Sequence, residues 1–480
     1  MLLRLLYNDY LAHAAYLIGC QRTGEAIVVD PGRDVDRYVD EAARHGLRIV
    51  ALTETHIHAD FLSGSRELAE KTGARLYLSD EGDADWKYGW LDARSDDGGY
   101  DHVLLNDGDT FNVGNIELRV MHTPGHTPEH ISFLITDQGG GASEPMGALT
   151  GDFVFVGDMG RPDLLETAAG MSGVKEASAH ALGRSAQRFL DLPDFLQVWP
   201  AHGAGSACGK ALGAVPQSTV GYERRQNPAL RLAEDREAFA EFILEGQPEP
   251  PLYFGRMKVQ NRDGVPLLGE LPRPVELGAE QLSAAASDHR AIVDTREWKP
   301  FRAGHLPGAL FAPLDGSFHG VVGSYLTPQD EIVVVAGRDA VETVVRELVR
   351  IGLDRVTAFV TPESLASGSA ALDTAPEVGV TALRDALAAG EASVLDVRRR
   401  AELGVGSVSD RAVNVAHTRL PDHLDALPRE GRLYVHCAGG RRSAFAVAYL
   451  RKMGFDAVNV AGGYAAWLRR GSVPSGPAAR

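Results

Sequence analysis

The chain has 480 residues, of which 44% are hydrophobic and 24% charged, and its formal net charge is −17. This length exceeds what one hydrophobic core supports and predicts two to four domains. The acidic balance argues against nucleic-acid binding, because the chain has no basic stripe to neutralise phosphates. No run of about 18 apolar residues is present to span a membrane, and residues 1–9 lack the features of a signal peptide. We expect neither a nucleic-acid partner nor a membrane partner.

The number and spacing of the cysteines indicate a reducing cellular compartment. The three cysteines, Cys20, Cys208 and Cys437, lie far apart in the sequence and form no paired framework. Free thiols are typical of a reducing environment. We therefore expect a cytoplasmic protein.

Residues 1–245 alternate short β-rich runs with turns and helical stretches. Residues 26–32 predict a buried strand that ends in a turn, residues 36–45 a helix, and residues 47–53 a second strand. The segment THIHADF (55–61) follows that strand directly. Its histidines are therefore expected on a loop at the carboxyl end of the strand, where functional residues commonly lie.

Four short segments of this region carry side chains of the kinds that bind metals. They are His56-x-His58-x-Asp60, Pro-Gly-His126-Thr, Thr-Gly-Asp152 and Ala-His202-Gly. Neutral imidazoles and ionised carboxylates are common ligands of zinc and iron. One histidine on a loop is usually a surface residue, but four such segments together predict a metal site.

The order of these segments resembles the metallo-β-lactamase fold, an αββα sandwich with metals at one edge. Relatives that carry H-x-H-x-D-H can hold two zinc ions and hydrolyse esters, thioesters or lactams. Here Phe61 stands in place of the last histidine. Because a phenyl ring cannot ligate, a second metal would lose one ligand, which disfavours a two-metal hydrolase.

Within that family, the segments are most similar to those of persulfide dioxygenases, whose single iron is held by two histidines and one aspartate. The resemblance implies His56, His126 and Asp152 as the ligands of one Fe(II) per chain. Two histidines and one carboxylate leave coordination positions open, as in non-haem Fe(II) oxygenases. O2 as co-substrate and a persulfide sulfur would bind there.

The same resemblance places further polar side chains around the metal. His58 and Asp60 would orient ligands or bind water, with direct ligation by His58 left open, and His202 would form a polar wall. The run Gly-Arg161-Pro-Asp163 would lie beside the substrate. Arg161 either clamps a carboxylate of the substrate thiol or pairs with Asp163.

Residues 246–275 carry six prolines and little periodicity, which predicts a linker packed on the surface. Beyond it the sequence repeats, since residues 291–296 and 393–398 are both apolar strands that end in Asp-x-Arg. Each is followed by a second strand, a loop and an amphipathic helix. Strands that alternate with helices predict two small α/β domains with parallel sheets, over residues 276–370 and 371–480.

The second repeat carries a candidate nucleophile. Cys437 follows a strand and precedes a helix, where free N–H groups and the helix dipole stabilise a thiolate. Arg441 and Arg442 add positive charge. The loop C-x-x-G-x-R resembles that of rhodanese sulfurtransferases, whereas related phosphatases use a loop one residue longer. The first repeat has no cysteine at this place, and we expect it to be catalytically silent.

The flanking sequence suggests a role for each of the other two cysteines. Cys208 lies six residues after His202 in a glycine-rich loop, which makes it a candidate auxiliary thiol, as a sulfur relay or a redox-sensitive group. Cys20 follows an apolar run and is expected in the core.

The order of a dioxygenase-like domain, a silent rhodanese and an active rhodanese resembles persulfide dioxygenase–rhodanese fusions of the CstB type. The resemblance implies that O2 oxidises a low-molecular-weight thiol persulfide to sulfite, and that Cys437 passes sulfane sulfur on to give thiosulfate, as in sulfide detoxification. The thiol would be glutathione, coenzyme A, a bacillithiol-like thiol or cysteine, and we expect a homo-oligomer. Two alternatives stay open: a zinc-dependent thioester hydrolase of the glyoxalase II type with rhodanese domains, and a sulfur-carrier protein.

Overall fold

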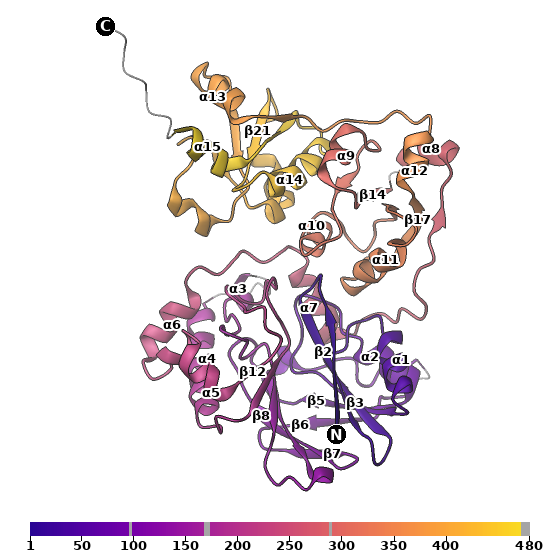
Figure 1. Cartoon of the computed structure of the whole chain (residues 1–480), viewed down its shortest axis with the longest axis vertical. Coiled ribbons are helices and arrows are strands. Elements are labelled where there is room, and N and C mark those ends of the chain that lie inside the picture. Colours follow the sequence, from indigo (N-terminus) through magenta and orange to yellow (C-terminus); the bar gives the residue numbers. More distant parts are fainter. Residues whose placement is uncertain (96–97, 168–172, 288–289, 472–480) are drawn as a thin grey trace. The chain divides into compact units, whose positions relative to one another are not determined.

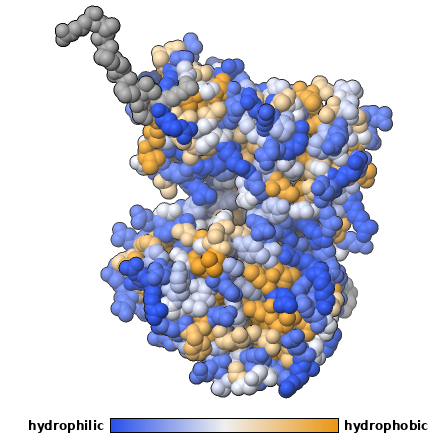
Figure 2. Space-filling view, viewed as in Figure 1, coloured by the Kyte–Doolittle hydropathy of each residue, from blue (hydrophilic) through white to orange (hydrophobic). Residues whose placement is uncertain are grey.

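The computed structural model describes residues 1–95, 98–167, 173–287 and 290–471. The chain forms an N-terminal unit, residues 1–271 with 349–352, and a C-terminal unit, residues 272–348 with 353–480. Hydrophilic side chains cover most of the visible surface of each unit, and hydrophobic ones form separate patches (Figure 2). Among the described helices, none is both long and apolar enough to cross a bilayer.

The N-terminal unit is built on two six-stranded sheets (Figure 1). The first sheet has the order β1–β2–β3–β4–β5–β6, antiparallel up to β3 and parallel from there on. The second has the order β12–β11–β10–β9–β8–β7, with one parallel pair, β10 and β11. The strands are β1 (Leu2–Asn8), β2 (His13–Cys20), β3 (Glu25–Val29), β4 (Arg48–Thr53), β5 (Arg75–Ser79), β6 (His102–Leu105), β7 (Thr110–Val113), β8 (Ile116–His122), β9 (Ile131–Asp137), β10 (Gly147–Gly151), β11 (Gln197–Pro200) and β12 (Ser218–Thr219).

Strand β2 shows how the sequence builds the layers. All of its residues are buried, and side chains alternate between the two faces of a strand. Tyr16 and Ile18 therefore pack between the sheets with Phe133 of β9, while Leu17 packs on the opposite face with Tyr38 of helix α1 (Asp36–Arg44). Helix α2 (Ser65–Thr72) covers the same outer face.

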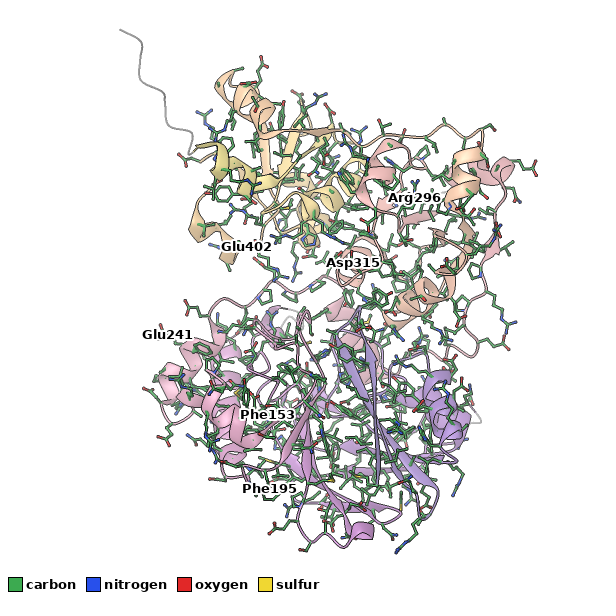
Figure 3. The ribbon with its side chains drawn as sticks, in the orientation of Figure 1. Phe153, Phe195, Glu241, Arg296, Asp315 and Glu402 are labelled. Carbon is green, nitrogen blue, oxygen red and sulfur yellow. The ribbon has the colours of Figure 1, made fainter. Side chains whose placement is uncertain are left out.

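A second helical layer covers the outer face of the other sheet. It consists of α4 (Lys175–Leu190), α5 (Val220–Gln226) and α6 (Arg236–Leu244), with the short α3 (Leu164–Thr167) before them. Phe153 packs inside this layer, whereas Phe195 is 59% exposed at the edge of the unit (Figure 3). The unit is thus an αββα sandwich, which confirms the predicted fold class.

Residues 246–275, predicted as a linker, contain the helix α7 (Phe254–Asp263). Phe254, Met257 and Asn261 on this helix are buried. The amide nitrogen of Asn261 donates to the carbonyl oxygens of His58 and Phe61, both at 2.8 Å, and its amide oxygen accepts from the backbone of Ser63 at 2.9 Å. Residues 246–271 therefore belong to the N-terminal unit and hold its histidine loop, a role that the proline content did not indicate.

The C-terminal unit contains two five-stranded parallel sheets with the same strand arrangement, as the sequence repeat predicts. The orders are β13–β17–β16–β14–β15 and β18–β22–β21–β19–β20. The strands are β13 (Val275–Glu276), β14 (Ala291–Asp294), β15 (Leu310–Phe311), β16 (Ile332–Val335), β17 (Val356–Val360), β18 (Glu377–Val378), β19 (Ser393–Asp396), β20 (Val413–Asn414), β21 (Leu433–His436) and β22 (Ala457–Val460). The helices are α8 (Leu282–Ser287), α9 (Trp298–Ala303), α10 (Phe318–Tyr325), α11 (Val341–Arg350), α12 (Pro362–Ser367), α13 (Val380–Ala388), α14 (Arg441–Lys452) and α15 (Gly463–Gly471).

The repeated Asp-x-Arg motif forms the same ion pair in both repeats. Arg398 donates to Asp396 at 2.6 Å and to the carbonyl of Gly406 at 2.7 Å. Arg296 donates to Asp294 at 2.6 Å and to a carbonyl eight residues further on at 2.8 Å. The motif thus ties the end of the first central strand to the loop that follows it. This requirement explains why both repeats carry it, with or without a cysteine.

We expect Asn261→Ala to destabilise the N-terminal unit, because three backbone groups of the histidine loop lose their buried partner. Each such loss costs about 1–3 kcal/mol. Urea unfolding of the full chain, followed by a signal from the N-terminal unit, measures the change. Asn112→Ala is the control, since that side chain bonds only an exposed glutamine. A midpoint for Asn261→Ala equal to that of the control would contradict the role given to α7.

Candidate metal centre and cysteine loop

The polar segments singled out in the sequence meet at one edge of the sandwich. His56 follows β4, His126 follows β8, Asp152 follows β10 and His202 follows β11. Loops that leave neighbouring strands at the same edge are a common place for function.

The first cluster consists of His56, His126 and Asp152, the three residues predicted as ligands. Their ligand atoms all lie within 4.8 Å of one another, and all three side chains are buried. Asp152 Oδ2 lies 3.5 Å from His126 Nε2 and 3.9 Å from His56 Nε2. Within the described residues, neither carboxylate oxygen of Asp152 nor Nε2 of His56 has a hydrogen-bond partner. Buried polar atoms without partners are costly, and a cation would satisfy all of them.

The far side of each imidazole is held by a hydrogen bond. His126 Nδ1 lies 3.0 Å from the carbonyl of Arg161, and His202 Nδ1 lies 3.0 Å from the carbonyl of Ala12. A carbonyl only accepts, so Nδ1 carries the proton and Nε2 presents its lone pair to the centre. Burial lowers the pKa of His126 and, with the neighbouring histidines, lowers that of His56 well below its usual value. Both are therefore neutral, as metal ligands must be.

His58 behaves differently from its neighbours. Its Nε2 lies 3.1 Å from Asp30, which also accepts from the backbone of Thr55 at 2.7 Å. Burial opposes protonation, but the carboxylate of Asp30 prevails and raises the pKa of His58 from 6.5 to about 9. A protonated imidazole has no lone pair for a metal, so this geometry favours the orienting role of His58 over ligation.

A second cluster lies beside the first. The ligand atoms of Asp60, His202 and Cys208 also lie within 4.8 Å of one another. His202 Nε2 is 3.3 Å from Asp60 and 3.4 Å from Asp152, so Asp152 reaches both clusters. Burial, followed by the charges of Asp60 and Asp152, raises the pKa of the Cys208 thiol well above its usual value. The thiol therefore stays protonated unless a cation binds.

Phe61 fills the space that the missing histidine would occupy. It is fully buried, and its ring centroid lies 4.4 Å from that of His58 and 4.1 Å from that of His13. Within the described residues, His13 Nε2 is buried without a hydrogen-bond partner. Phe61 thus forms an apolar wall between two histidines.

Arg161 and Asp163 form a closed pair. Arg161 donates to Asp163 through Nε at 2.8 Å and through Nη2 at 2.6 Å, and its Nη1 donates to the carbonyl of Ala207. Arg161 is only 1% exposed. Of the two roles predicted for Arg161, this geometry supports pairing over a clamp on the substrate. Its carbonyl supports His126 instead.

The cysteine loop lies in the second repeat, between β21 and α14. The backbone N–H of Gly440 donates to Cys437 Sγ at 3.1 Å, and the hydroxyl of Ser443 approaches the same sulfur at 3.6 Å. Gly440 has a φ of +97°, a backbone conformation that glycine adopts without strain. The loop therefore directs the N–H of Gly440 at the thiol, in agreement with the sequence motif.

The two arginines of this loop are engaged by carboxylates that the sequence analysis did not single out. Arg442 forms a bidentate pair with Glu402 at 2.5 and 2.6 Å. Arg441 pairs with Asp315, which belongs to the first repeat. The positive charge beside Cys437 is therefore partly compensated, and the first repeat contributes one of the compensating groups.

Comparison with known proteins agrees with this geometry. A family model described as the metallo-beta-lactamase superfamily matches residues 9–202, and one described as a rhodanese-like domain matches residues 380–470. A crystal structure of a metallo-beta-lactamase from Staphylococcus aureus aligns with 75% of this chain and 99% of its own, at 38% identity and a TM-score of 0.66. The chain belongs to the metallo-beta-lactamase superfamily. A rhodanese domain follows the metallo-beta-lactamase domain in the same chain.

Two relatives in sequence cover mainly the metallo-beta-lactamase part. A beta-lactamase hydrolase-like protein from Agrobacterium fabrum is 30% identical over 289 residues, which are 56% of this chain and 60% of that relative. The mitochondrial persulfide dioxygenase ETHE1 of Bos taurus is 26% identical over 237 residues, which are 48% of this chain and 77% of that relative. The chain thus spans about three fifths of the length of the first relative, and its relatives carry different activities.

The metallo-beta-lactamase site also contains His130, a positioning residue that the sequence motifs did not identify. His130 Nε2 accepts from the backbone of Asp152 at 3.0 Å, and its Nδ1 contacts Thr123 Oγ1 at 2.8 Å. Its ring stacks on His56 with a centroid distance of 5.1 Å. His130 lies four residues after His126 in the same segment, so its position in the sequence was the available signal.

The stability of the metallo-beta-lactamase site should depend on pH through His58. A pKa raised from 6.5 to about 9 stabilises the folded state fully below pH 6.5, and this contribution is lost as the pH rises through about 9. We expect the free energy of unfolding to fall by up to about 3 kcal/mol over that range. His58→Gln should flatten the profile, whereas His102→Gln on β6 should not. Urea titrations at several pH values measure this, and a steep profile retained in His58→Gln would contradict the pairing with Asp30.

Proposed function

We propose that the chain is an Fe(II)-dependent persulfide dioxygenase coupled to a sulfurtransferase. The observation that carries this proposal is the buried set of two histidines and one aspartate with unpartnered atoms turned inward. His56, His126 and Asp152 would hold one iron, and the similarity to persulfide dioxygenase ETHE1 supports this choice. Bound Fe(II) supplies the redox chemistry for O2. The overall change is RSSH + O2 + H2O → RSH + H2SO3, in which the terminal sulfur is oxidised and O2 is reduced.

The chain's own residues prepare this site in three ways. The carbonyls of Arg161 and Ala12 keep the imidazole Nε2 atoms of His126 and His202 directed inward. His130 holds the backbone of Asp152. Phe61 places an apolar ring beside the site, which excludes water and provides a surface compatible with sulfur.

The second step is assigned to the rhodanese domain. Cys437 would carry the sulfane sulfur as a persulfide, held by N–H groups of the loop such as that of Gly440. Sulfite attacks the outer sulfur, the S–S bond breaks, and its electron pair remains on Cys437 as a thiolate while thiosulfate leaves. We propose that residues 1–245 form the dioxygenase domain together with most of the segment 246–275, whose residues up to 271 belong to the same unit, and that a silent repeat (276–370) and an active repeat (371–480) follow.

A second candidate function is a zinc-dependent thioester hydrolase of the glyoxalase II type with rhodanese domains. One observation favours it: Asp60, His202 and Cys208 offer a second set of metal ligands despite Phe61. Two adjacent metals that share Asp152 would suit hydrolysis by an activated water. The two candidates therefore differ in metal content and in the need for O2.

Metal content and oxygen uptake decide between them. We expect purified protein to contain about one iron per chain and to consume O2 with glutathione or coenzyme A persulfide. His126→Ala should lower O2 uptake by at least about 100-fold, because loss of a ligand exceeds the 10–100-fold effects of residues that support ligands. His102→Ala is the matched control. Stoichiometric zinc, no O2 uptake and hydrolysis of S-lactoylglutathione would identify the hydrolase.

Replacement of the nucleophile separates the two steps. Cys437→Ser should leave O2 uptake largely unchanged and shift the product from thiosulfate to sulfite, because the serine hydroxyl cannot carry sulfane sulfur. Sulfite and thiosulfate are quantified by chromatography after derivatisation, with Cys20→Ser as the control. Thiosulfate at the wild-type rate in Cys437→Ser would refute the assignment. A sulfur-carrier protein would instead be indicated if Cys437→Ser lost all activity and His126→Ala kept the wild-type activity.

A further inference from the structure

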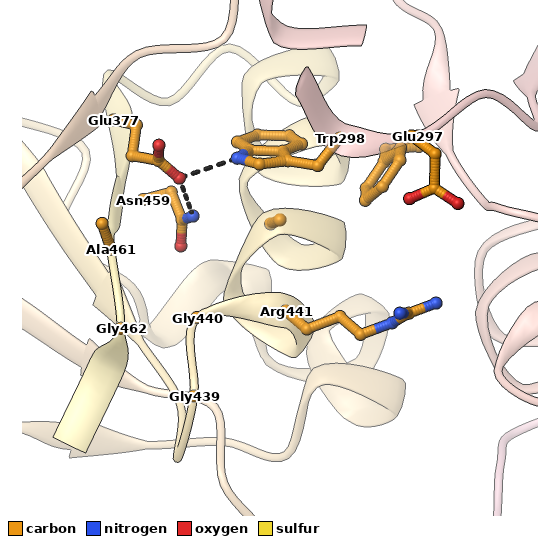
Figure 4. Close-up of a pocket in the computed structure, with 11 residues that line it drawn as sticks. Glu297, Trp298, Glu377, Gly439, Gly440, Arg441, Asn459, Ala461 and Gly462 are labelled. Atoms are coloured by element: carbon orange, nitrogen blue, oxygen red, sulfur yellow. Dashed lines mark hydrogen bonds between the residues drawn. The ribbon is translucent and has the colours of Figure 1, made fainter. Parts of the chain in front are cut away.

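The C-terminal unit contains a pocket of about 270 Å³ where the two repeats meet. We call it the junction pocket. Helix α9 and strand β15 of the first repeat form one wall, and β18, β22 and the start of α14 in the second repeat form the other (Figure 4). Its lining includes Glu297, Trp298, Glu377, Arg441 and Asn459.

The junction pocket borders the cysteine loop without including its thiol. Gly439 and Gly440 line it, whereas Cys437 is absent from its lining. A side chain at Gly439 would meet nothing within 4 Å, so the backbone of the loop lies open to the pocket. Gly440 is also the residue whose N–H donates to Cys437 Sγ. An occupant of the pocket would thus touch the loop that surrounds the thiol.

Asn459 supplies the strongest indication of a ligand. Its amide nitrogen donates to Glu377 Oε2 at 2.9 Å. A carboxylate only accepts, so this contact fixes the amide orientation and turns the amide oxygen away from Glu377 (Figure 4). Asn459 is 1% exposed, and within the described residues its oxygen has no hydrogen-bond partner. A buried acceptor of this kind calls for a donor from outside the protein.

The charges of the lining favour a cation. Glu377 already accepts from Trp298 Nε1 at 2.7 Å and from Arg302 at 2.6 Å. Glu297 adds an exposed carboxylate at the rim. The guanidinium of Arg441 is paired with Asp315. The acceptors left for an occupant are therefore the amide oxygen of Asn459 and the carboxylate of Glu297 at the rim.

The aromatic wall completes the recognition of a cation. Trp298 lies half-buried against Phe311, with ring centroids 5.1 Å apart. Indole faces attract ammonium groups through their quadrupole, and the attraction is strongest for tryptophan among the aromatic side chains. The amide oxygen of Asn459 and the indole of Trp298 together match a primary ammonium group.

We propose that the junction pocket binds a small organic cation through its primary ammonium group. The ammonium donates to the amide oxygen of Asn459 and packs on the indole of Trp298, while the carboxylate of Glu297, on the other side of Trp298, adds negative charge at the rim (Figure 4). The silent repeat supplies Trp298 and Glu297, which gives this cysteine-free copy a binding role of its own. The proposal does not depend on which reaction Cys437 supports.

Calorimetric titration of the full chain tests the proposal with n-butylammonium as the probe. Its neutral isostere 1-butanol should bind at least about tenfold more weakly, because it brings no charge to the indole face and the carboxylate. Trp298→Ala should weaken n-butylammonium binding about tenfold. Glu297→Gln, a surface change that leaves the fold intact, should weaken it about threefold and reduce its salt dependence.

Two matched variants serve as controls. Trp467→Ala removes an indole that stacks on Arg384 outside the pocket, and Glu363→Gln removes an exposed carboxylate of the first repeat. Neither should change n-butylammonium binding. Hydrogen exchange should slow on binding at residues 297–311 and 439–462, which places the probe in the pocket. Equal binding of 1-butanol, no saturable binding, or binding that survives both Trp298→Ala and Glu297→Gln would overturn the proposal.

Discussion

The N-terminal unit depends on one electrostatic constraint: a buried carboxylate, Asp152, lies among imidazoles with no partner for its oxygens within the described residues. Such a group is costly in a protein interior unless a positive charge meets it. Burial lowers the pKa of His56 and of His126, while Asp30 raises the pKa of His58 and holds its ring. The negative charge of Asp152 is therefore left to be balanced by a metal ion.

Backbone conformation contributes to the same end. Among the described residues other than glycine, only Ala12 and Asp30 have a positive φ, at +50° and +51°. Both sit directly behind the centre, where the carbonyl of Ala12 accepts a hydrogen bond from His202 Nδ1 and Asp30 holds His58 and Thr55. Strained backbone is retained where the surrounding contacts enforce it, and it concentrates at functional sites. The strain here positions hydrogen-bond acceptors.

The alternation of strands and helices predicted the parallel sheets of the second unit, and the resemblance of short motifs to a known family implied the sandwich and the meeting of His56, His126 and Asp152. The sequence did not predict partners that come from distant elements. Glu402 and the α7 residue Asn261 are ordinary polar residues in the sequence, and only the fold brings them to Arg442 and to the histidine loop. The proline content around α7 suggested a linker because it outweighed one buried helical face.

Helix α7 shifts the C-terminal boundary of the N-terminal unit beyond residue 245. Asn261 bonds the backbone of the histidine loop from a position about 200 residues further along the chain, beyond the last residue of the family match at 202. A fragment ending at 245 would keep every predicted ligand and still lose the clamp on the loop that carries His56 and Asp60. The segment between the sandwich and the repeats is therefore part of the folding unit, and any recombination of these domains has to carry it with the N-terminal part.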